Sequence, residues 1–340
     1  MVKIVRFHKT GGPNVLQIDD CSLDSLGPDE VTVRVKAFGI NRSECMLRNG
    51  SYIFQPVTPC RIGFEGTGTI ESVGNNVTAH DVGDDVSIIP FAVANEHGFW
   101  QSMPKDHGTY GEITTVPVSA VIKIPKTVST VINAAAWHQY LTAWGGLMYY
   151  GCITPDDIVL VTAASSSAAI GGIHLAKERG AMVIAVTTSP EKIDKISSIG
   201  ADHVFLLNDV SFKQEVYRVT EGKGVTLIYD PIAGNLTNTI IDVAAPEARI
   251  ICYGNLDRYD SCFPAHNALK KRISIKFYSW GDIARRPKEL REAHSYVYSN
   301  LSKGVFNPII DTIFYGLESC IAAHERMEAN SQVGKIVVKI

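Results

Sequence analysis

The segment from Asp157 to Lys192 constrains the fold more than any other part of the sequence. It begins with an apolar run, DIVLVT, continues through a turn of small residues, AASSSAAIGG, and leads through a helical pattern to a second apolar run, MVIAVTTSPEK. This order of strand, tight turn, helix and strand is typical of a nucleotide-binding βαβ unit. The turn and the helix N-terminus then offer backbone N–H groups and a positive dipole to a pyrophosphate.

The end of the second strand indicates which nucleotide is bound. Units that bind NAD have an acidic residue there, about 20 residues beyond the turn, for the ribose 2′-hydroxyl. This sequence has hydroxyl-bearing residues instead, followed by a lysine: Thr187, Thr188, Ser189 and Lys192. Hydroxyls and an ammonium attract a 2′-phosphate, whereas a carboxylate repels it. The sequence therefore predicts NADPH as the cofactor.

The turn lacks the glycines of the usual G-x-G-x-x-G fingerprint. Ala164, Ser166 and Ala169 stand where those glycines would be. Alanine and serine are small enough for a close approach, but they lack the freedom of glycine at positive φ. Two interpretations stay open: a phosphate site that uses serine hydroxyls, and a strand-to-helix turn that binds nothing. The predicted phosphate-binding residues are Ser165, Ser166, Ser167 and Ala168.

Composition narrows the classes of function. Of the 340 residues, 45% are hydrophobic and 20% are charged, and the formal net charge is −3. Lysine and arginine are scattered, so no surface for nucleic acid or an anionic membrane is predicted. Because the chain has no run of 18 apolar residues and no leader-like N-terminal pattern, we expect a cytoplasmic protein. The seven cysteines form no C-x-x-C pair, which argues against a disulfide framework and a structural zinc site.

The arrangement of apolar patterns predicts two kinds of structure along the chain. The first part has β-type segments, VTVRVKAFGI, GTGTIESVG, DDVSIIP and EITTVPV, between Gly, Pro and Asn-Asn turns. Strands and helices then alternate. The strands of this second part are expected at 159–162, 182–186, 203–207, 225–229, 249–253 and 273–278. They predict a doubly wound parallel sheet. A helix at 286–303 and the strands PIIDTIFY and KIVVKI follow, and we expect them to return to the N-terminal β domain.

Three motifs carry a family resemblance: GINRSE at 39–44, GFEGTGTIESVG at 63–74 and DIVLVTAASSSAAIGG at 157–172. With them the whole chain resembles the medium-chain dehydrogenase/reductase superfamily, and within it the zinc-independent NADPH:quinone oxidoreductase and enoyl reductase group. The resemblance implies an α/β protein with a GroES-like β-rich catalytic domain at 1–127 and 281–340. It also implies a Rossmann NADPH-binding domain at 128–280.

The resemblance also implies an enzyme without a metal. The zinc alcohol dehydrogenases of this superfamily have a ligand cysteine where this chain has Asn41. They have a G-H-E motif where it has Gly63, Phe64 and Glu65. An amide and a phenyl ring do not hold zinc, and the four-cysteine lobe of those enzymes is absent from the sequence.

Conjugate reduction is the easier chemistry for such an enzyme. Hydride passes from the nicotinamide to an enone, an enoyl thioester or a quinone, and the resulting oxyanion needs a hydrogen-bond donor. The segment NRSECMLRNGSY is similar to the family segment that ends in a tyrosine facing the nicotinamide. By this resemblance Tyr52 is the catalytic donor, and Asn41 contacts the cofactor or the substrate. The alternatives are a packed surface-loop aromatic for Tyr52 and a buried turn asparagine for Asn41.

Further site residues follow from the same resemblance. In WHQYLTAW at 137–144, Thr142 is expected on the nicotinamide side, and His138 is interpreted as structural. Tyr253 and Gly254 lie at the carboxyl end of a strand, where nucleotides bind in such sheets. Gly334 is a cofactor residue in the closing motif, and Lys335 either borders the site or is a solvated charge. A substrate pocket between the domains is expected near Tyr52, Phe64, Phe91, Trp137 and Tyr278, with the irregular segment 91–110 as a substrate-facing loop.

Two other functions stay open. A trans-2-enoyl-thioester reductase needs an acyl channel and a basic mouth, for which the clusters at 270–272 and 285–286 are candidates. An NADPH-binding sensor or structural protein with no turnover is the other, because the turn lacks glycine. In related dimers the strand ISIKFYSW at 273–280 pairs with its mate, so the resemblance implies a homodimer that acts on a small-molecule substrate.

Overall fold

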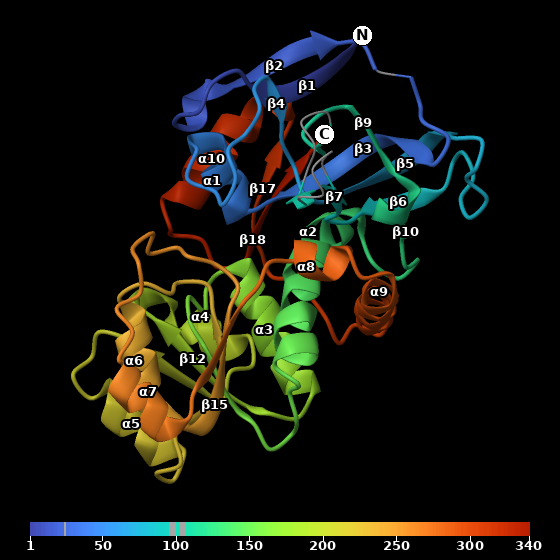
Figure 1. The fold of residues 1–340 in the computed structure, drawn as a ribbon. Helices are drawn as coiled ribbons and strands as arrows, with labels where there is room; N and C mark the ends of the chain where they lie inside the picture. The colour runs from blue at the N-terminus through green and yellow to red at the C-terminus, as the bar shows by residue number, and fades with distance from the viewer. Residues whose placement is uncertain (24, 95–99, 103–106) are drawn as a thin grey trace. The chain divides into compact units, whose positions relative to one another are not determined.

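The computed structural model describes all residues except 24, 95–99 and 103–106. It contains two compact units, coloured along the chain in Figure 1. Unit 1 comprises residues 1–138 and 307–340, and unit 2 comprises residues 139–306. The boundaries between the two compact units therefore lie at 138/139 and 306/307. The domain boundaries expected from the sequence are 127/128 and 280/281.

Unit 1 is built on mainly antiparallel sheets, with a parallel pair between β17 and β18. A three-stranded sheet has the order β2-β1-β4, and a seven-stranded sheet has the order β10-β6-β5-β3-β18-β17, with β9 also paired to β3. The pair β7 and β8 forms a separate ribbon. The strand bounds are β1 (Val2–Phe7), β2 (Leu16–Cys21), β3 (Glu30–Ile40), β4 (Cys60–Arg61), β5 (Gly66–Val73), β6 (Asp85–Ile88), β7 (Ala92–Ala94), β8 (Trp100–Ser102), β9 (Ile113–Pro117), β10 (Val121–Lys123), β17 (Ile310–Tyr315) and β18 (Lys335–Lys339).

The long strand β3 organises this unit because it pairs with three others. Its valines at 31, 33 and 35 are buried and alternate with more polar residues, as the period of a strand requires. The closing strand β18 pairs antiparallel with β3, with Val337 opposite Gly39. The return of the C-terminal strands to the N-terminal β structure is thus confirmed.

Short helices complete unit 1. They are α1 (Arg42–Asn49), α10 (Cys320–Glu328) and the 3-10 turns η1 (Pro13–Val15), η2 (Val118–Ala120) and η5 (Leu317–Ser319). Helix α2 (Thr130–Ala143) begins in unit 1, where Ala134 and Ala135 pack on Ala37 and Val337. Gly39 permits this approach, because a Cβ there would lie 2.7 Å from the Ala134 carbonyl oxygen.

Unit 2 contains a six-stranded sheet with the order β13-β12-β11-β14-β15-β16. Every neighbouring pair in it is parallel. Each strand overlaps its expected range, with bounds that differ by at most one residue except for β15, which begins five residues earlier than expected, and the doubly wound parallel sheet is confirmed. The bounds are β11 (Ile158–Val161), β12 (Met182–Thr187), β13 (His203–Leu206), β14 (Val225–Asp230), β15 (Ala244–Cys252) and β16 (Ser274–Phe277).

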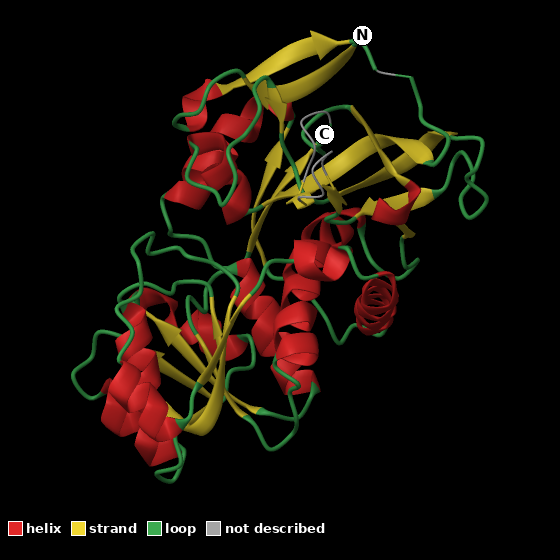
Figure 2. Ribbon diagram, in the orientation of Figure 1, coloured by secondary structure: helices red, strands yellow, loops and turns green. Residues whose placement is uncertain are grey.

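Helices cover the sheet of unit 2, as Figure 2 shows. The apolar side chains of α5, α6 and α7 form one core with those of the strands. The bounds are α3 (Ser167–Glu178), α4 (Ile193–Ser198), α5 (Phe212–Val219), α6 (Leu236–Val243), α7 (Ala265–Lys271), α8 (Gly281–Ala284), α9 (Pro287–Ser302), the 3-10 turn η4 (Pro190–Lys192) and the π-helix η3 (Trp144–Tyr150).

The helix expected at 286–303 is α9, and its expected return to the β domain is wrong. It belongs to unit 2. The reason is aromatic packing: Tyr296 of α9 meets Phe306 edge-on, with ring centroids 5.9 Å apart, and Phe306 stacks on Tyr140 at 4.2 Å. Only the segment from 307 onward joins unit 1.

None of the helices that the described residues form combines the length and the apolar character needed to cross a membrane.

Candidate functional site

The predicted phosphate-binding turn of unit 2 follows β11 directly. Ala163 has a left-handed backbone, with φ +47°, although alanine disfavours that region. The next residue donates its N–H to the Val186 carbonyl oxygen at 3.1 Å, which ties the turn to β12. Helix α3 then begins with Ser166 as its N-cap, whose hydroxyl oxygen accepts the Ala169 N–H at 3.3 Å. The turn therefore has the strand-to-helix geometry of a phosphate site without the usual glycines.

The lysine predicted to bind a 2′-phosphate lies against this turn. Lys192 is buried, with 6% of its surface exposed, and its Nζ donates to the Ser165 hydroxyl at 3.3 Å. Ser189 lies three residues before it in the chain and donates its backbone N–H to Thr187 Oγ1 at 3.1 Å. The residues predicted from the end of β12 and from the turn thus meet in one place. The contact places the Lys192 ammonium against the Ser165 hydroxyl.

Tyrosine rings gather at the carboxyl ends of β14 and β15 and just after β16. Tyr253 stacks on Tyr229 with ring centroids 4.0 Å apart. Tyr278 donates its hydroxyl to the Thr142 carbonyl oxygen, so two predicted site residues are in contact. Gly146 of the π-helix makes room for these rings, because a Cβ there would lie 2.6 Å from the Tyr229 ring.

The surroundings of Tyr253 connect this cluster with the turn. Burial raises the pKa of Tyr253 well above its ordinary value, and the charge of Asp230 adds to this, while Ser166 and Tyr229 oppose the rise. The neighbouring Gly254 is packed tightly, since a Cβ there would lie 2.8 Å from the Pro231 carbonyl oxygen.

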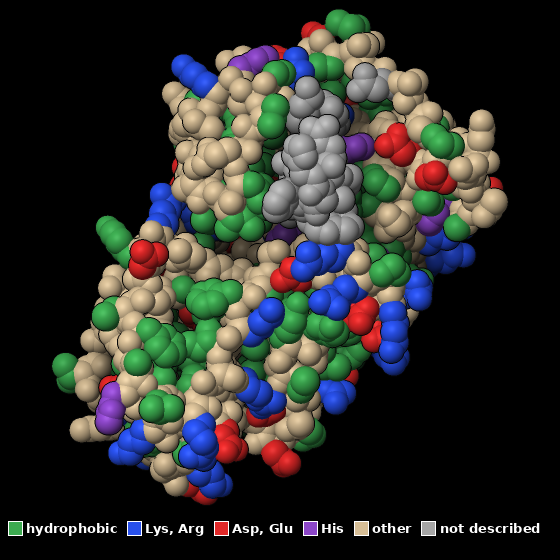
Figure 3. All heavy atoms as spheres, in the orientation of Figure 1, with side chains coloured by type: hydrophobic (Ala, Val, Ile, Leu, Met, Phe, Trp, Pro, Cys, Tyr) green, Lys and Arg blue, Asp and Glu red, His purple; other side chains and the backbone are tan. Residues whose placement is uncertain are grey.

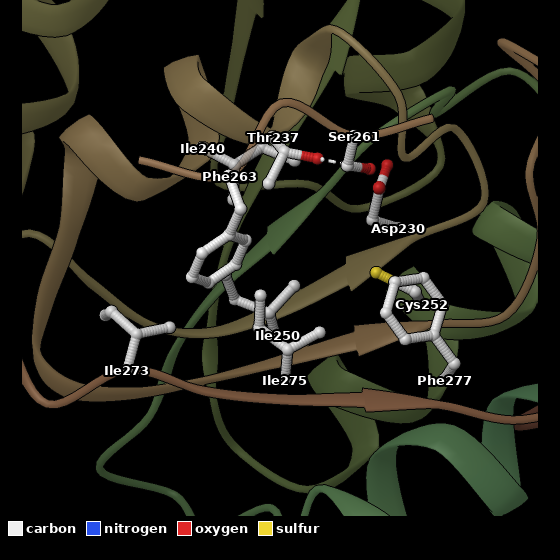
Figure 4. Close-up of a pocket in the computed structure, with 10 residues that line it drawn as sticks. All are labelled: Asp230, Thr237, Ile240, Ile250, Cys252, Ser261, Phe263, Ile273, Ile275 and Phe277. Atoms are coloured by element: carbon white, nitrogen blue, oxygen red, sulfur yellow. Dashed lines mark hydrogen bonds between the residues drawn. The ribbon is translucent and has the colours of Figure 1, made fainter. Parts of the chain in front are cut away.

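A pocket of about 380 Å³ opens beside the same strand ends in unit 2 (Figure 4). Its polar lining includes Asp230, Thr237 and Ser261, and the rest is mainly isoleucine and phenylalanine. Thr237 donates to Ser261 at 3.1 Å across it. Asp230 is held by the Thr162 hydroxyl and two backbone N–H groups. None of the predicted site residues lines this pocket, so it is not the predicted substrate pocket.

In unit 1, the position of Tyr52 follows from the end of α1. Gly50 ends the helix with a left-handed backbone, φ +78°, and the chain turns back so that the Tyr52 N–H bonds to the Met46 carbonyl oxygen at 3.1 Å. The Tyr52 ring is half-buried and packs against Phe54 at 4.8 Å and Phe64 at 6.4 Å between centroids. Tyr52 is therefore a packed residue near Phe64.

Burial, together with the charge of Glu44, raises the pKa of Tyr52 to about 12. The hydroxyl stays protonated at neutral pH, and a protonated phenol donates a hydrogen bond. The environment of Tyr52 thus suits a hydrogen-bond donor to a developing oxyanion rather than a base.

Asn41 caps the other end of α1, and its amide is held by charged side chains. Lys335 Nζ donates to Asn41 Oδ1 at 2.6 Å. The amide nitrogen donates to Glu44 and Glu65, at 3.3 Å each. Only 4% of the residue is exposed. The amide is therefore committed to the interior of unit 1, and a contact with the cofactor or substrate remains a prediction.

Lys335 is fully buried and forms an ion pair with fully buried Glu65, with Nζ and Oε1 2.6 Å apart. The interpretation of Lys335 as a solvated charge is wrong. The preceding residue, Gly334, has φ +99°, and a Cβ there would lie 2.3 Å from the Ile309 carbonyl oxygen. The backbone of β18 thus requires this glycine.

Phe64, the second position at which zinc-dependent relatives carry a ligand, stacks on His138 with ring centroids 5.6 Å apart. Burial lowers the pKa of His138 to about 4, so the imidazole is neutral at neutral pH. Its neighbour Trp137 is completely buried. Phe91 is half-buried and meets His107 edge-on. Residues 95–99 and 103–106 of the expected substrate-facing loop lie outside the described residues.

The structure thus brings the predicted residues together in groups within each unit. Unit 2 pairs Ser165 with Lys192 and Thr142 with Tyr278, and unit 1 gathers Asn41, Tyr52 and Phe64 around Glu44. The sequence does not indicate Glu44 and Glu65 as site residues, and it leaves Lys335 open between a place at the site and a solvated charge. Spacing signals one of them, because Asn41 and Glu44 stand at the Ncap and N3 positions of a capping box.

No group of three or more His, Cys, Asp or Glu side chains suited to a metal ion occurs among the residues that the structure describes.

Comparison with protein families identifies both parts of the chain. A model described as "Alcohol dehydrogenase GroES-like domain" matches residues 27–126. One described as "Zinc-binding dehydrogenase" matches residues 169–297.

Curated relatives are similar along most of this chain. The zebrafish (Danio rerio) synaptic vesicle membrane protein VAT-1 homolog is 27% identical over 92% of this chain. The chain spans only 65% of that protein's length, and 14% of a Mycobacterium tuberculosis phenolphthiocerol/phthiocerol polyketide synthase subunit. A quinone oxidoreductase of Salmonella typhimurium is 25% identical over 98% of both chains.

Solved structures share the whole fold. A quinone oxidoreductase of Pseudomonas syringae matches with a TM-score of 0.88 and 26% identity over 100% of both chains. The Escherichia coli quinone oxidoreductase complexed with NADPH has a TM-score of 0.88 at 23% identity, over 99% of this chain and 100% of that one, and is compared for its fold alone. The two domain models and these relatives indicate the same superfamily, and the residues at positions 41 and 64 match its group without zinc ligands. The chain belongs to the medium-chain dehydrogenase/reductase superfamily, in its zinc-independent quinone oxidoreductase group.

Proposed function

We propose that this chain is an NADPH-dependent oxidoreductase that transfers hydride to a quinone or to an α,β-unsaturated carbonyl compound. The observation that carries the proposal is the contact of buried Lys192 with Ser165, beside a strand end that has no carboxylate. An ammonium beside a hydroxyl suits a 2′-phosphate. Similar proteins named as quinone oxidoreductases support the reaction, and the similar Escherichia coli structure is named as a complex with NADPH.

The residues of unit 2 fit such a nucleotide. Helix α3 presents its N-terminus at the turn, with Ser166 as the cap and Ser167 and Ala168 in the first turn. These backbone N–H groups and the helix dipole favour a pyrophosphate. Ser165 and Lys192 would hold the 2′-phosphate, while Tyr253 and Gly254 would bind nearer the nicotinamide. Bound NADPH supplies the hydride.

Unit 1 supplies the group that responds to the charge on the acceptor. We assign this role to Tyr52, which would donate its hydroxyl proton in a hydrogen bond to the acceptor oxygen as negative charge develops there. Its pKa of about 12, raised by burial, keeps the proton on the hydroxyl at neutral pH. Donors aimed at a developing oxyanion contribute more to the rate than to the binding of the substrate.

The basic clusters considered for a thioester carrier are engaged within unit 2, and they do not favour that substrate. Arg285 pairs with Asp282 at 2.9 Å, and Arg286 lies 5.5 Å above the Tyr149 ring. Lys271 donates to three backbone carbonyl oxygens. Figure 3 shows Lys and Arg side chains over the region of α8 and α9 on one face. We therefore favour a carbonyl acceptor without a phosphate carrier.

Steady-state kinetics with several acceptors test this function. Purified protein is given NADPH with 1,4-naphthoquinone, a simple enone, and crotonyl and decenoyl thioesters, and kcat/KM is compared. We expect NADPH oxidation with the quinone or the enone at a higher kcat/KM than with either thioester. Saturable NADPH binding with no oxidation by any acceptor would contradict the proposal and favour a sensor or structural role.

We also propose that the protein is a cytoplasmic homodimer. Strand β16 is an edge of the six-stranded sheet, and its Phe277 side chain is 61% exposed. An exposed apolar edge strand is a ready surface for pairing with another chain. Cell fractionation tests the location.

A further inference from the structure

Two buried carboxylates in unit 1 hold the backbone of three separate segments. The Glu44 carboxylate accepts the N–H of Asn41 at 2.7 Å and the N–H of Phe64 at 2.6 Å. The Glu65 carboxylate accepts the N–H of His138 at 2.8 Å. Neither carboxylate has any exposed surface. Two of the residues held in this way, Phe64 and His138, stack on each other, and Tyr52 packs against the same Phe64 ring.

Glu44 is saturated with donors. One of its oxygens accepts the Asn41 N–H and the Tyr110 hydroxyl, the latter at 2.6 Å. The other accepts the Phe64 N–H and the Asn41 amide nitrogen. Four donors facing one side chain suit an ionised carboxylate, which has only acceptor sites. An amide at this position would turn its NH₂ group toward two of the donors.

We infer that Glu44 is a positioning residue of the acceptor site, whose ionised carboxylate fixes the main chain at Asn41 and Phe64 and, through Phe64, the surface against which Tyr52 packs. The inference rests on the proposed function. Charge balance agrees with it, because Lys335 offsets Glu65 through a direct ion pair and also acts on Glu44. Misplacement of an acceptor by about 1 Å is enough to lower a rate by about 10²-fold.

Protonation of Glu44 would break this arrangement. Burial raises the pKa of Glu44 to about 7, while the donors from Tyr110, Asn41 and Phe64 oppose the rise. Below that pH the carboxyl group gains a proton, and at least one of the four donors loses its acceptor. The active form is therefore the ionised one, and kcat should rise with pH to a plateau above neutrality.

The other titratable groups that face Glu44 do not change charge near pH 7. Tyr52 has a pKa of about 12, and the pKa of Tyr110 is raised further by burial. Burial raises the pKa of Cys45 to about 12 and that of Cys320 beyond that value. His324 binds the Tyr110 hydroxyl, and burial lowers its pKa to about 3.

The test compares the pH dependence of kcat, at saturating NADPH and acceptor, for the wild type, Glu44→Gln and Tyr110→Phe. In the wild type we expect kcat to fall below pH 7. Glu44→Gln should lower the plateau by about 10- to 100-fold and remove this fall, with NADPH affinity unchanged. Tyr110→Phe removes a donor that lowers the Glu44 pKa, so the fall should move to higher pH with a similar plateau.

Two controls make the result specific. Glu71→Gln removes a partly exposed carboxylate that pairs with Arg34 on the surface of unit 1, and it should leave both plateau and profile unchanged. Glu44→Asp keeps the charge, so it should keep the fall in kcat at low pH even where its plateau is reduced. Thermal melts identify any variant that does not fold.

The outcomes separate this inference from the proposed function. A wild type that oxidises NADPH, together with a Glu44→Gln variant of unchanged plateau and profile, would overturn the positioning role alone. A folded Glu44→Gln variant that keeps the wild-type fall on a lowered plateau would also overturn it, because another group would then titrate. A wild type with no turnover on any acceptor would overturn the proposed function and this inference together.

Discussion

Tyr52 is the single residue on which the proposed chemistry depends most directly. Its ring is fixed by Phe54 and Phe64, and its hydroxyl is kept protonated by burial and by the Glu44 charge. Removal of the hydroxyl leaves this packing in place but takes away the donor. The effect of the change therefore falls on the rate of the chemical step.

Tyr52→Phe should lower kcat by about 10²-fold and leave NADPH affinity nearly unchanged. Steady-state kinetics and a fluorescence titration measure the two quantities. Tyr259→Phe is the matched control, because Tyr259 is 68% exposed and outside the site. If the chemical step limits the rate and Tyr52→Phe leaves kcat unaltered, Tyr52 is not the hydrogen-bond donor to the acceptor oxygen.

Local and distant contacts differ in how far the sequence predicts them. The sequence predicts that the turn around Ser165 binds the pyrophosphate and that Lys192 binds the 2′-phosphate of the same nucleotide, and the structure brings Ser165 and Lys192 into contact. Their positions follow from a local strand, turn and helix pattern. The buried pair of Glu65 and Lys335 joins residues far apart in the chain, so periodicity gives no sign of it. From the sequence alone, a charged residue in a short motif is predicted to be exposed, because the partner that would allow its burial is not known.

At the scale of elements, the turn between β11 and α3 stores a local strain. Ala163 has φ +47°, where a Cβ is crowded, and glycine would adopt this conformation without penalty. The sequence predicts the turn and shows that it lacks glycines. It did not predict that an alanine would take the left-handed conformation, because that choice is set by the link from the turn to β12.

Ala163→Gly should stabilise the protein by about 1 kcal/mol, because relief of the left-handed strain outweighs the added entropy of the unfolded chain. Ala164→Gly is the control: that residue is fully buried without positive φ, so it should destabilise by roughly 1 kcal/mol or more. Urea unfolding measures both free energies. An Ala163→Gly variant less stable than the wild type would contradict the claim that the backbone of Ala163 is strained.

At the scale of the whole molecule, the sequence predicted both kinds of sheet but not every assignment to a unit. Strands with a clear period were found, and their order follows from the doubly wound pattern. Helix α9 was placed in the wrong unit, because only the packing of Tyr296 and Phe306 with Tyr140 decides where it belongs. Amphipathic periodicity shows that a helix has an apolar face, but it does not show which hydrophobic core that face packs against.

The exposed edge at β16 leads to a prediction about assembly. Light scattering at micromolar concentration should give twice the mass of one chain. Phe277→Lys should shift the protein toward monomer, because it places a charge on the apolar edge. Val210→Lys is the control, since Val210 is fully exposed and lies in the connection between β13 and α5 rather than in a strand. A monomeric mass for the wild type would contradict the homodimer.

The measurement that tests the central claim most directly is a fluorescence titration with NADPH and NADH, followed in the same cuvette by 1,4-naphthoquinone. We predict that NADPH binds more tightly than NADH and is oxidised when the quinone is added. Lys192→Ala should weaken NADPH binding by about tenfold or more and leave NADH binding nearly unchanged. Failure of the wild type to bind either nucleotide would contradict the account, because the turn and Lys192 would then have no ligand to hold.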